Sequence, residues 1–357
     1  MKIVVAMSGG VDSSVAAALL AEQGHDVIGL SMQLYDQSDG QTSFGSCCTL
    51  DDLHDARRVA AAIRIPHYIL NFERQFEETV VSNFVREYAG GRTPLPCTHC
   101  NSSLKFAALV DRAQGLGADA VATGHYARVD RDERGRFRLR RGVDPSKDQS
   151  YFLFSLTQDQ LARAVFPVGD RAKDDVRAYA RERALPVADK ADSQEICFVP
   201  DRDYARFIEG HAPETRRDGP IVDEEGREIG RHGGIHRFTV GQRKGLGVAS
   251  ASPVPGAPLY VLRLRPSDGT VVVGPKASLE RTTLTASRVN WIAREPAESV
   301  RAAVQIRHRH LAAPATVRAL GGGRAEVTFD APQIAVTPGQ AAVFYNGDTV
   351  LGGGWID

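Results

Sequence analysis

The stretch VVAMSGGVDSSVAAALL, residues 4–20, decides the fold of this chain. A short apolar strand ends at Met7, glycines and hydroxyl residues follow it, and helical periodicity begins at Val11. At such a junction, backbone N–H groups and the positive end of the helix converge on an anion. Gly9 and Gly10 let the backbone approach a phosphate because they carry no Cβ. The stretch therefore predicts a phosphate-binding loop at the end of the first strand.

The composition of the loop narrows the kind of phosphate site. It lacks both the G-x-x-x-x-G-K-[ST] and the G-x-G-x-x-G patterns. Ser8, Ser13 and Ser14 add hydroxyl donors, whereas the carboxylate of Asp12 repels a phosphate unless Mg²⁺ lies between them. We interpret Asp12 as the residue that manages Mg²⁺ or the leaving group. The alternative is an ordinary strand–helix turn whose Asp or Ser only caps the helix.

The first two hundred residues alternate between strand-like and helix-like segments. The expected strands are residues 2–7, 26–32, 67–72 and 118–123, and the expected helices are residues 11–23, 51–63, a segment ending near residue 88, and 101–116. A βαβα rhythm of this kind is typical of a parallel sheet with helices on both faces. We expect an α/β fold with a doubly wound parallel sheet.

The residue pattern of the sequence changes after Gly210. The stretch EGHAPETRRDGP has the composition of a linker, and short β-patterned runs separated by glycine turns follow it. Such runs are typical of small barrels or sandwiches. We predict a catalytic domain over residues 1–210, a β-rich domain over 211–280 and a C-terminal β-barrel over 281–357.

The bulk composition describes a globular protein, with 42% hydrophobic and 25% charged residues. The formal net charge is zero, so total charge does not indicate a nucleic-acid partner. Two stretches are locally basic: IRHRH, residues 306–310, and RDERGRFRLRR, residues 131–141. The second predicts either a solvated hairpin or a rim that contacts phosphates, and the sequence does not choose between them.

The five cysteines bear on the cellular compartment. The apolar run at residues 3–7 is too short for the core of a signal peptide, and no run is long enough to span a bilayer. An odd number of cysteines without an export signal favours a reducing cytoplasm. We therefore expect a cytoplasmic protein whose cysteines act chemically. Cys47 and Cys48 have no evident chemical geometry, and we expect them to be structural or incidental.

Two other cysteines frame a question that spacing alone leaves open. Cys97 and Cys100 form a Cys-x-x-Cys pair in TPLPCTHCNSSLKF. This pair is compatible with half of a metal site, with a redox pair, or with one member of a catalytic pair whose partner lies elsewhere. Cys197, between Ile196 and Phe198, would by itself be interpreted as a small buried hydrophobic residue.

Residues 8–13, Ser-Gly-Gly-Val-Asp-Ser, resemble the PP-loop of the ATP pyrophosphatases, which split ATP between the α and β phosphates and adenylate a carbonyl oxygen. The segments TPLPCTHCN, TGHYARV, GVDPSKDQSYFLFSL, DSQEICFVPDRDYARFI, GIHRFTVGQRKGLG and TPGQAAVFYNGDTVLGGGWI follow in this order. Together they resemble the tRNA-specific 2-thiouridylase family over nearly the whole chain. The resemblance implies ATP-dependent 2-thiolation of the wobble uridine of tRNA.

The resemblance also assigns the two distant cysteines. It implies that Cys197 carries a persulfide, and that Cys100 resolves it as a Cys100–Cys197 disulfide or by releasing sulfide. We expect Cys100 to lie just before a helix start, where the dipole favours the thiolate, and His99 to assist when protonated.

The remaining site residues are carried over from the same resemblance. ATP is expected to contact Ala6, Met7, Ser8, Gly9, Gly10, Val11, Asp12, Ser13, Met32 and Gly124, together with Mg²⁺. The tRNA and its target base are expected to contact Leu95, Pro96, Cys97, Lys147, Asp148, Gln149, Arg307 and His308. Leu95 stands where the family usually has Asn, and Cys97 where some relatives have Asp, so a polar contact from residue 95 is not expected.

Several alternatives stay open at this point. Cys97, Cys100 and Cys197 would together provide three ligands for a [4Fe–4S] cluster acting as the sulfur carrier. A small-molecule ATP pyrophosphatase and an RNA-binding protein without activity would both fit parts of the pattern. The family implies the tRNAs for Glu, Gln and Lys as partners, with a cysteine desulfurase or a sulfur-relay protein as the sulfur donor.

Overall fold

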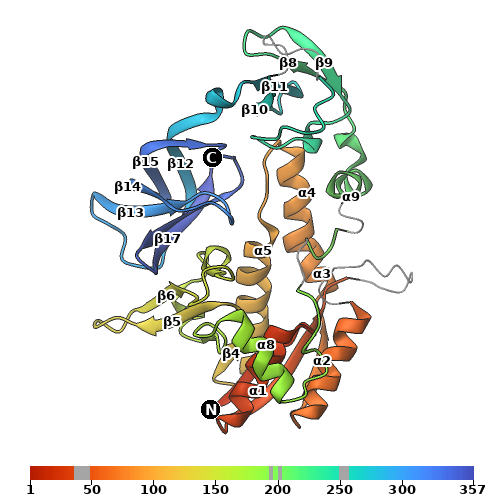
Figure 1. Cartoon of the computed structure of the whole chain (residues 1–357), viewed down its shortest axis with the longest axis vertical. Coiled ribbons are helices and arrows are strands. Elements are labelled where there is room, and N and C mark those ends of the chain that lie inside the picture. Colours follow the sequence, from red (N-terminus) through yellow and green to blue (C-terminus); the bar gives the residue numbers. More distant parts are fainter. Residues whose placement is uncertain (36–48, 193–195, 200–202, 249–256) are drawn as a thin grey trace. The chain divides into compact units, whose positions relative to one another are not determined.

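The computed structural model describes residues 1–35, 49–192, 196–199, 203–248 and 257–357 (Figure 1). Cys47 and Cys48 lie outside these described residues. The chain divides into two compact units. Unit 1 comprises Met1–Val81, Pro96–Arg202 and Gly347–Leu351, and unit 2 comprises Ser82–Leu95, Asp203–Asn346 and Gly352–Asp357.

Unit 1 is built on a parallel sheet. Its strands are β1 (Lys2–Ala6), β2 (Asp26–Gln33), β3 (His67–Asn71), β4 (Ala120–Ala122) and β7 (Ala164–Val165), in the order β3-β2-β1-β4-β7. The chain adds β2 and β3 on one side of β1 and then β4 on the other, and every pairing is parallel. The strand order therefore reverses between β1 and β4, where open α/β sheets bind their ligands.

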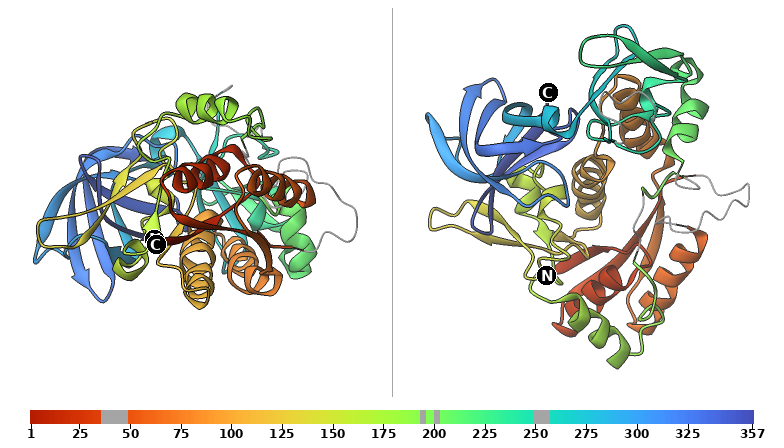
Figure 2. Two further views of the ribbon diagram at one scale, coloured as in Figure 1. Left: turned by 90° about the horizontal axis from the view of Figure 1, so that it is seen from below. Right: turned by 45° about the horizontal axis from the view of Figure 1, so that its top comes forward.

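Helices cover both faces of this sheet. The face formed by Ile3, Val5 and Met7 packs against α1 (Val11–Glu22) and α2 (Leu50–Ala62). The opposite face packs against α6 (Leu109–Gly115), which continues the π-helical segment η2 (Cys100–Ala108). The left view of Figure 2 shows the red strands between the red α1 and the golden helix of residues 100–115. The helices on both faces confirm the predicted doubly wound sheet. They pack there because the strands are apolar on both faces.

The remaining helical elements are short. They are α3 (Glu73–Phe76), η1 (Glu77–Val81), α4 (Ser82–Ala89), α5 (Pro96–His99), η3 (Ser150–Phe152), α7 (Gln158–Leu161), α8 (Lys173–Glu182), α9 (Tyr204–His211), η5 (Pro213–Thr215), η6 (Ile235–Arg237) and η7 (Lys276–Leu279). Most predicted elements are found within one or two residues of their expected ends, but one helix start was wrong. The helix expected from Asn101 begins at Pro96, because proline suits the first helical position.

The basic stretch at residues 131–141 forms most of a hairpin, made by β5 (Ala127–Arg131) and β6 (Phe137–Arg141). Arg138 and Arg140 contact the carboxylate of Asp130 at 2.6 and 3.1 Å. Arg140 and Arg128 also contact Asp348, at 2.5 and 2.7 Å. Arg138 and Arg140 are thus paired within unit 1, while Arg131 and Arg134 are exposed, and a contact of this hairpin with phosphates stays a prediction.

Unit 2 begins with a smaller sheet. Its strands, in the order β10-β11-β8-β9, are β10 (Tyr260–Arg265), β11 (Thr270–Gly274), β8 (Gly219–Val222) and β9 (Glu228–His232). Its core contains Ile221, Phe238, Val261, Val271 and Val273. The sheet confirms that a β-rich region follows the parallel-sheet domain.

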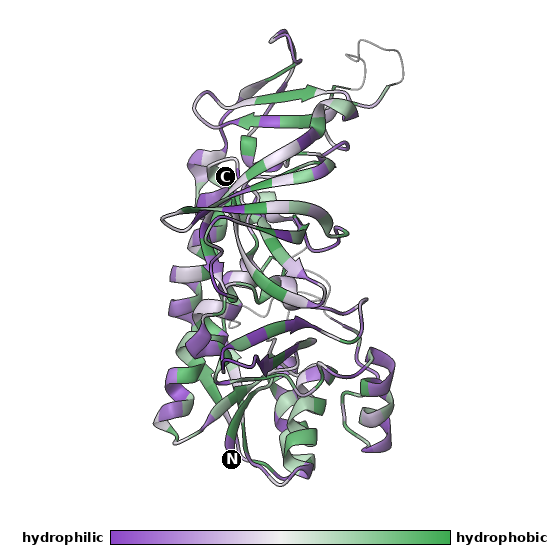
Figure 3. Cartoon of the chain, turned by 90° about the vertical axis from the view of Figure 1, so that its left-hand side faces the viewer, coloured by the Kyte–Doolittle hydropathy of each residue, from purple (hydrophilic) through white to green (hydrophobic). Residues whose placement is uncertain are grey.

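A closed barrel completes unit 2. Its strands are β12 (Glu280–Trp291), β15 (Arg324–Ile334), β14 (Ala313–Gly321), β13 (Ser299–Gln305), β16 (Ala341–Asn346) and β17 (Thr349–Ile356), and β12 pairs with β17 to close it. The same sheet continues from β17 to β6 through Thr349 and Val350, so that the β5–β6 hairpin extends it. Hydrophobic and hydrophilic residues alternate along these strands in Figure 3, as expected for strands with one buried face. The division of the chain at residues 210 and 280 stays a prediction.

Within the described part of the chain, no helix combines the length and the apolar composition that membrane crossing needs.

Candidate active site

The loop after β1 has the shape that its glycines predict. Gly9 has φ +72°, and a Cβ on this residue would lie 2.1 Å from the backbone oxygen of Asp52. Gly10 caps the N-terminus of α1 without a side-chain hydrogen bond, and a Cβ there would meet only the Ser8 hydroxyl, at 3.7 Å. The first backbone amides of α1 therefore have no side-chain cap, and the space beside Gly10 is open. This arrangement fits a phosphate.

The three serines of the loop have different tasks. The buried Ser13 hydroxyl donates to the backbone oxygen of Gly10 at 3.2 Å and accepts from the backbone N–H of Ser8 at 3.2 Å. Ser14 donates to the same Gly10 oxygen at 2.8 Å. These two hydroxyls brace the loop, and the exposed Ser8 hydroxyl is the one best placed for a ligand.

The other predicted nucleotide residues lie around the reversal of the strand order. Gly124 follows β4, and a Cβ on it would lie 2.5 Å from the backbone nitrogen of Ser13. The structure therefore brings Gly124 against the start of α1. Met32 lies near the end of β2 and is 6% exposed. Ala6, Met7 and Val11 have buried side chains, so only their backbone is available to a nucleotide.

Asp12 has partners that the sequence did not reveal. Its two carboxylate oxygens accept hydrogen bonds from the Lys173 ammonium at 2.7 and 2.8 Å. The Tyr126 hydroxyl donates to the same carboxylate at 2.8 Å. Burial, followed by the negative charge of Asp12, raises the pKa of Tyr126, so this phenol stays a neutral donor. In this structure Lys173 neutralises the charge that we had expected Mg²⁺ to offset.

Lys173 also contacts a second carboxylate, that of Asp192, at 2.8 Å. Arg177 and Lys147 reach Asp192 at 2.8 Å each. Burial raises the pKa of Asp192, but hydrogen bonds from Lys147 and Lys173 outweigh it and lower the pKa to about 2. Asp192 is therefore ionised at neutral pH and holds three cations beside the nucleotide loop.

A second lysine fastens the loop from its other side. The Lys190 ammonium donates to the backbone oxygen of Gly9 at 3.1 Å and to Asp52 and Asp55 at 2.6 Å each. Burial lowers the pKa of Lys190, but the hydrogen bonds to the two carboxylates outweigh it and raise the pKa. Asp52 is itself held by the capping box that it forms with Thr49 at the start of α2. The loop is thus tied to the N-terminus of α2.

The predicted tRNA-contacting residues 147–149 lie beside this network. The Asp148 carboxylate accepts from Arg141 at 2.7 Å and from the backbone N–H groups of Gly142 and Ser150. The Gln149 side chain accepts from the backbone of Tyr126. Both side chains are occupied within unit 1. Lys147 is also paired, with Asp192, but it has the only cationic side chain of the three and is 37% exposed.

His125 is a buried histidine that the sequence did not single out. Its Nδ1 lies 2.6 Å from the Thr123 hydroxyl, and its ring packs near Phe106 and Phe166. Burial, followed by the positive charge of Lys105, holds the pKa of His125 well below its usual range. The imidazole is therefore neutral at physiological pH. It directly follows Gly124 in the chain, but its ring is buried beside Phe106 and Phe166.

The cysteines lie in unit 1, but not all in the expected setting. Cys100 is buried and begins η2 directly after α5, so it sits one turn inside a helix that starts at Pro96. Our expectation that Cys100 precedes a helix start was wrong. The exposed Cys97 is the second residue of this helix, which starts five residues earlier than the sequence suggested.

Cys197 is half-buried, and the next residue, Phe198, packs against Phe76 of α3 with 5.4 Å between ring centroids. Helix α3 in turn packs against η2, which Cys100 begins. The segment of Cys197 therefore rests on an element that touches the helix of Cys100. A direct Cys100–Cys197 pairing stays a prediction. Leu95, in unit 2, is buried.

Arg307 and His308 are exposed in a turn after β13 of the barrel. The buried Gln305 amide donates to the backbone oxygens of both residues, at 3.2 and 2.8 Å. The turn is therefore held from inside, and the exposed Arg307 guanidinium donates to the backbone oxygen of Ile334 at 3.1 Å. Such a support suits a surface contact, and the role of these residues stays a prediction.

The structure bears on the hypothesis that three cysteines hold a metal cluster. Within the described ranges, no group of three or more His, Cys, Asp or Glu side chains is arranged to hold a metal ion. Cys97, Cys100 and Cys197 thus do not form the described ligand set that a [4Fe–4S] cluster would need. We derive no step through such a cluster.

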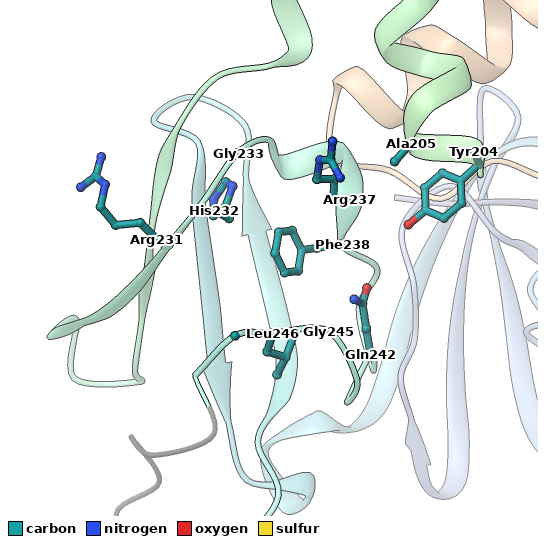
Figure 4. A pocket seen from close by; sticks show the side chains of 11 residues that line it. Tyr204, Ala205, Arg231, His232, Gly233, Arg237, Phe238, Gln242, Gly245 and Leu246 are labelled. Atoms are coloured by element: carbon teal, nitrogen blue, oxygen red, sulfur yellow. The ribbon is translucent and has the colours of Figure 1, made fainter.

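A separate pocket of about 460 Å³ lies in unit 2 (Figure 4). Tyr204, Arg231, His232, Arg237, Phe238 and Gln242 are among its lining residues. Arg237 contacts the buried carboxylate of Glu209, which also binds Arg216 and His236. None of the predicted site residues lines this pocket.

Comparisons with known proteins agree with this geometry. A family model described as a tRNA methyl transferase HUP domain matches residues 1–201, a PRC-barrel domain model of the same name matches 205–275, and an aminomethyltransferase beta-barrel domain model matches 281–356. A protein of Geotalea uraniireducens (strain Rf4) is 54% identical over 361 residues, covering 100% of this chain and 95% of that protein. One of Solibacter usitatus (strain Ellin6076) is 55% identical over 372 residues, covering 99% of each. Both are named tRNA-specific 2-thiouridylase MnmA.

Among solved structures, a 4-thiouridine synthetase–RNA complex with bound ATP is similar with a TM-score of 0.35. It has 17% identity over 60% of this chain and 50% of that chain, and this slight likeness carries no argument. The family match and the full-length relatives do carry one. This chain belongs to the tRNA-specific 2-thiouridylase (MnmA) family.

Proposed function

We propose that this protein catalyses the ATP-dependent 2-thiolation of uridine 34 of tRNA. The observation that carries the proposal is the glycine loop at the reversal of the strand order, where uncapped amides of α1 adjoin Gly124. The same unit contains Cys100 and Cys197, which an ATP-using ligase of small molecules would not need. Relatives covering the whole chain bear the name of this activity.

The first half of the reaction makes C2 of uracil reactive. The C2 oxygen is a poor leaving group. It attacks the α phosphate of ATP, which forms an adenylated base and releases pyrophosphate. The amides at the start of α1 and the Ser8 hydroxyl are placed to hold the phosphates. Lys173 adds a buried positive charge near the departing pyrophosphate, because it lies against Asp12 in the first turn of α1.

Mg²⁺ fits this site through Asp12, since Mg²⁺ is commonly bound by one or two carboxylates together with substrate phosphates. The ion would supply charge neutralisation for the phosphates. Asp12 would then exchange part of its contact with Lys173 for the ion. The Tyr126 hydroxyl keeps the carboxylate oriented during that exchange, because its raised pKa preserves the donor.

The second half transfers sulfur. The terminal sulfur of a Cys197 persulfide attacks C2, and AMP leaves with the former C2 oxygen. The Cys100 thiolate then attacks the Cys197 sulfur, which breaks the S–S bond to the base and leaves a C2=S group. The products are 2-thiouridine and a Cys100–Cys197 disulfide, and a reductant must restore both thiols.

The persulfide has to be supplied by another protein. A cysteine desulfurase, acting directly or through a sulfur-relay protein, provides sulfur in the oxidation state that a persulfide requires. The tRNAs for Glu, Gln and Lys are the proposed substrates. Lys147, Arg307 and His308 are the proposed contacts to their phosphates, since cationic side chains in such positions fix register without reading bases.

A reconstituted reaction with a cysteine desulfurase and tRNA tests the proposal. We expect Cys100→Ser and Cys197→Ser to lose thiolation, measured by mass analysis of the tRNA, while tRNA-stimulated pyrophosphate release persists. Cys97→Ser should keep substantial thiolation, because the persulfide route does not use it. Thiolation that follows iron content and disappears with Cys97→Ser would contradict this route.

A further inference from the structure

A row of charged side chains connects the proposed tRNA contact with the nucleotide loop in unit 1. We call Lys147, Asp192, Lys173 and Asp12 the ionic relay. Lys147 donates to Asp192 at 2.8 Å, Asp192 contacts Lys173 at 2.8 Å, and Lys173 contacts Asp12 at 2.7 Å. Positive and negative charges alternate along the relay, so a change of partner at one end alters the balance at the other.

The centre of the relay is enclosed and its ends are open. The Lys173 side chain is 8% exposed, whereas those of Lys147 and Asp12 are 37% and 30% exposed. A ligand can reach the two ends, but water screens the central contacts poorly. Because Lys173 lies nearly equidistant from Asp192 and Asp12, its ammonium is shared between them, and a modest electrostatic change can shift the sharing.

A second connection ties the backbone of the same elements. The Asp144 carboxylate accepts from the backbone N–H of Lys173 at 3.0 Å, at the first residue of α8. Its other oxygen accepts from the backbone and hydroxyl of Ser146 at 2.9 and 2.7 Å. The turn that carries Lys147 is therefore attached to the start of α8. This attachment keeps Lys147 and Lys173 in a fixed relation through both main chain and side chains.

We propose that Asp192 is a positioning residue through which tRNA binding at Lys147 strengthens nucleotide binding at the loop. This inference rests on the proposed function. A tRNA phosphate at Lys147 removes one of the three cations around Asp192, which then attracts Lys173 more strongly although Arg177 stays bound. Asp12 loses part of its contact with Lys173 and becomes available to the metal–phosphate group of the nucleotide. By linkage, the nucleotide strengthens tRNA binding by the same factor.

The experiment measures binding rather than turnover. The full-length protein is titrated with an ATP analogue that has a methylene group between the α and β phosphates, in the presence of Mg²⁺. The affinity is measured with and without tRNA for Glu. We expect tRNA to tighten analogue binding at least about 5-fold, the lower end of usual coupling between sites. Asp192→Asn should bring this factor close to one while both ligands still bind. Asp192→Glu should restore part of it, because the charge returns.

Lys147→Met provides a second test, in which analogue binding is expected to gain strength. Removing this cation imitates its capture by a phosphate, so analogue binding without tRNA should tighten, and added tRNA should have little further effect. A relay with only a structural role would not produce this gain. The matched control is Asp189→Asn, whose carboxylate is 80% exposed and pairs with Arg181 outside the relay. The control should keep the wild-type factor.

The outcomes distinguish a failure of the ionic relay from a failure of the proposed function. An unchanged coupling factor in Asp192→Asn, or a wild-type protein that binds both ligands without coupling, overturns the relay and leaves the proposed function standing. A wild-type protein that binds no tRNA contradicts the proposed function itself. Thermal unfolding of each variant shows whether it is folded. If Asp192→Asn does not fold, Lys147→Met decides the question alone.

Discussion

The nucleotide loop and the C-terminal barrel contain ion pairs of similar length in different surroundings. Lys173 meets Asp12 at 2.7 Å with 8% of the lysine side chain exposed. Arg301 meets Asp330 in the barrel at 2.6 Å, with side chains 60% and 49% exposed. The distance between the charged atoms of an ion pair therefore does not indicate how much the pair contributes to stability. Solvent screens the barrel pair, whereas breaking the enclosed pair leaves a charge with little compensation.

The largest effect should come from the loop backbone, through Gly9→Ala. The left-handed conformation of Gly9 costs an alanine about 1–2 kcal/mol, and crowding costs about 1–3 kcal/mol more. The crowding arises because the new Cβ would lie 2.1 Å from the Asp52 oxygen. We expect a loss of about 4 kcal/mol in the free energy of unfolding, measured in urea, and loss of ATP binding.

Gly24→Ala is the matched control for this change. Gly24 has φ +78°, but nothing lies within 4 Å of a Cβ built on it. We expect this variant to lose only the conformational part, about 1–2 kcal/mol, and to bind ATP normally. Equal losses for the two glycines would show that the contact with α2 has no energetic weight.

The next largest effect should come from Lys173→Met. The substitution keeps the length of the side chain but leaves the carboxylates of Asp12 and Asp192 without their shared cation. We expect the free energy of unfolding to fall by about 3 kcal/mol, the lower end for a broken buried pair, because both carboxylates are partly exposed. Tyr126 and Arg177 keep their contacts with the two carboxylates, which limits the loss.

Arg181→Met on the same helix gives the comparison for Lys173. Its side chain is 59% exposed and pairs with the exposed Asp189. It should change stability by less than about 1 kcal/mol. Thermal unfolding of both variants at neutral pH checks the difference, and similar losses would contradict the contrast between enclosed and exposed pairs.

A smaller and different effect is expected from Arg307→Ala in the barrel. Because Gln305 holds the turn through backbone oxygens, the turn should persist without the arginine side chain. We expect weaker tRNA binding, with the slope of log K against log salt reduced by about one phosphate's worth. ATP binding should not change. Filter binding at several salt concentrations measures the slope, and an unaltered slope would remove Arg307 from the interface.

The smallest effect should come from Arg301→Ala. Its pair with Asp330 is exposed and screened by solvent, so we expect no measurable change in the free energy of unfolding. We also expect tRNA binding to stay unchanged, which makes this variant the control for Arg307→Ala. A loss comparable with that of Lys173→Met would show that burial does not govern these pairs.

The sequence predicted the elements of the parallel sheet because their periodicity is local. Residues 4–20 contain a complete strand, turn and helix start, and each feature depends on neighbours within a few positions. The start at Pro96 was missed although proline at the first helical position is a known signal.

The charged residues around the loop could not be found in this way. Lys173 is 161 positions from Asp12, and Lys190 is 181 positions from Gly9. A lysine in a polar stretch gives no local sign of its partner, because exposed lysines are common and only tertiary packing buries this one. The nearest available hint was the position of Lys190 and Asp192 shortly before Cys197.

The strand β17 has a consequence for how the protein can be divided. Gly347–Leu351 belong to unit 1 and Gly352–Asp357 to unit 2, while Ser82–Leu95 belong to unit 2 although unit 1 flanks them in sequence. Neither unit is a continuous piece of chain. A fragment ending before Gly347 would lose part of both units at once. Autonomous expression of the N-terminal half should therefore give incomplete folding, and ribosomal synthesis must reach the last residues before either unit is complete.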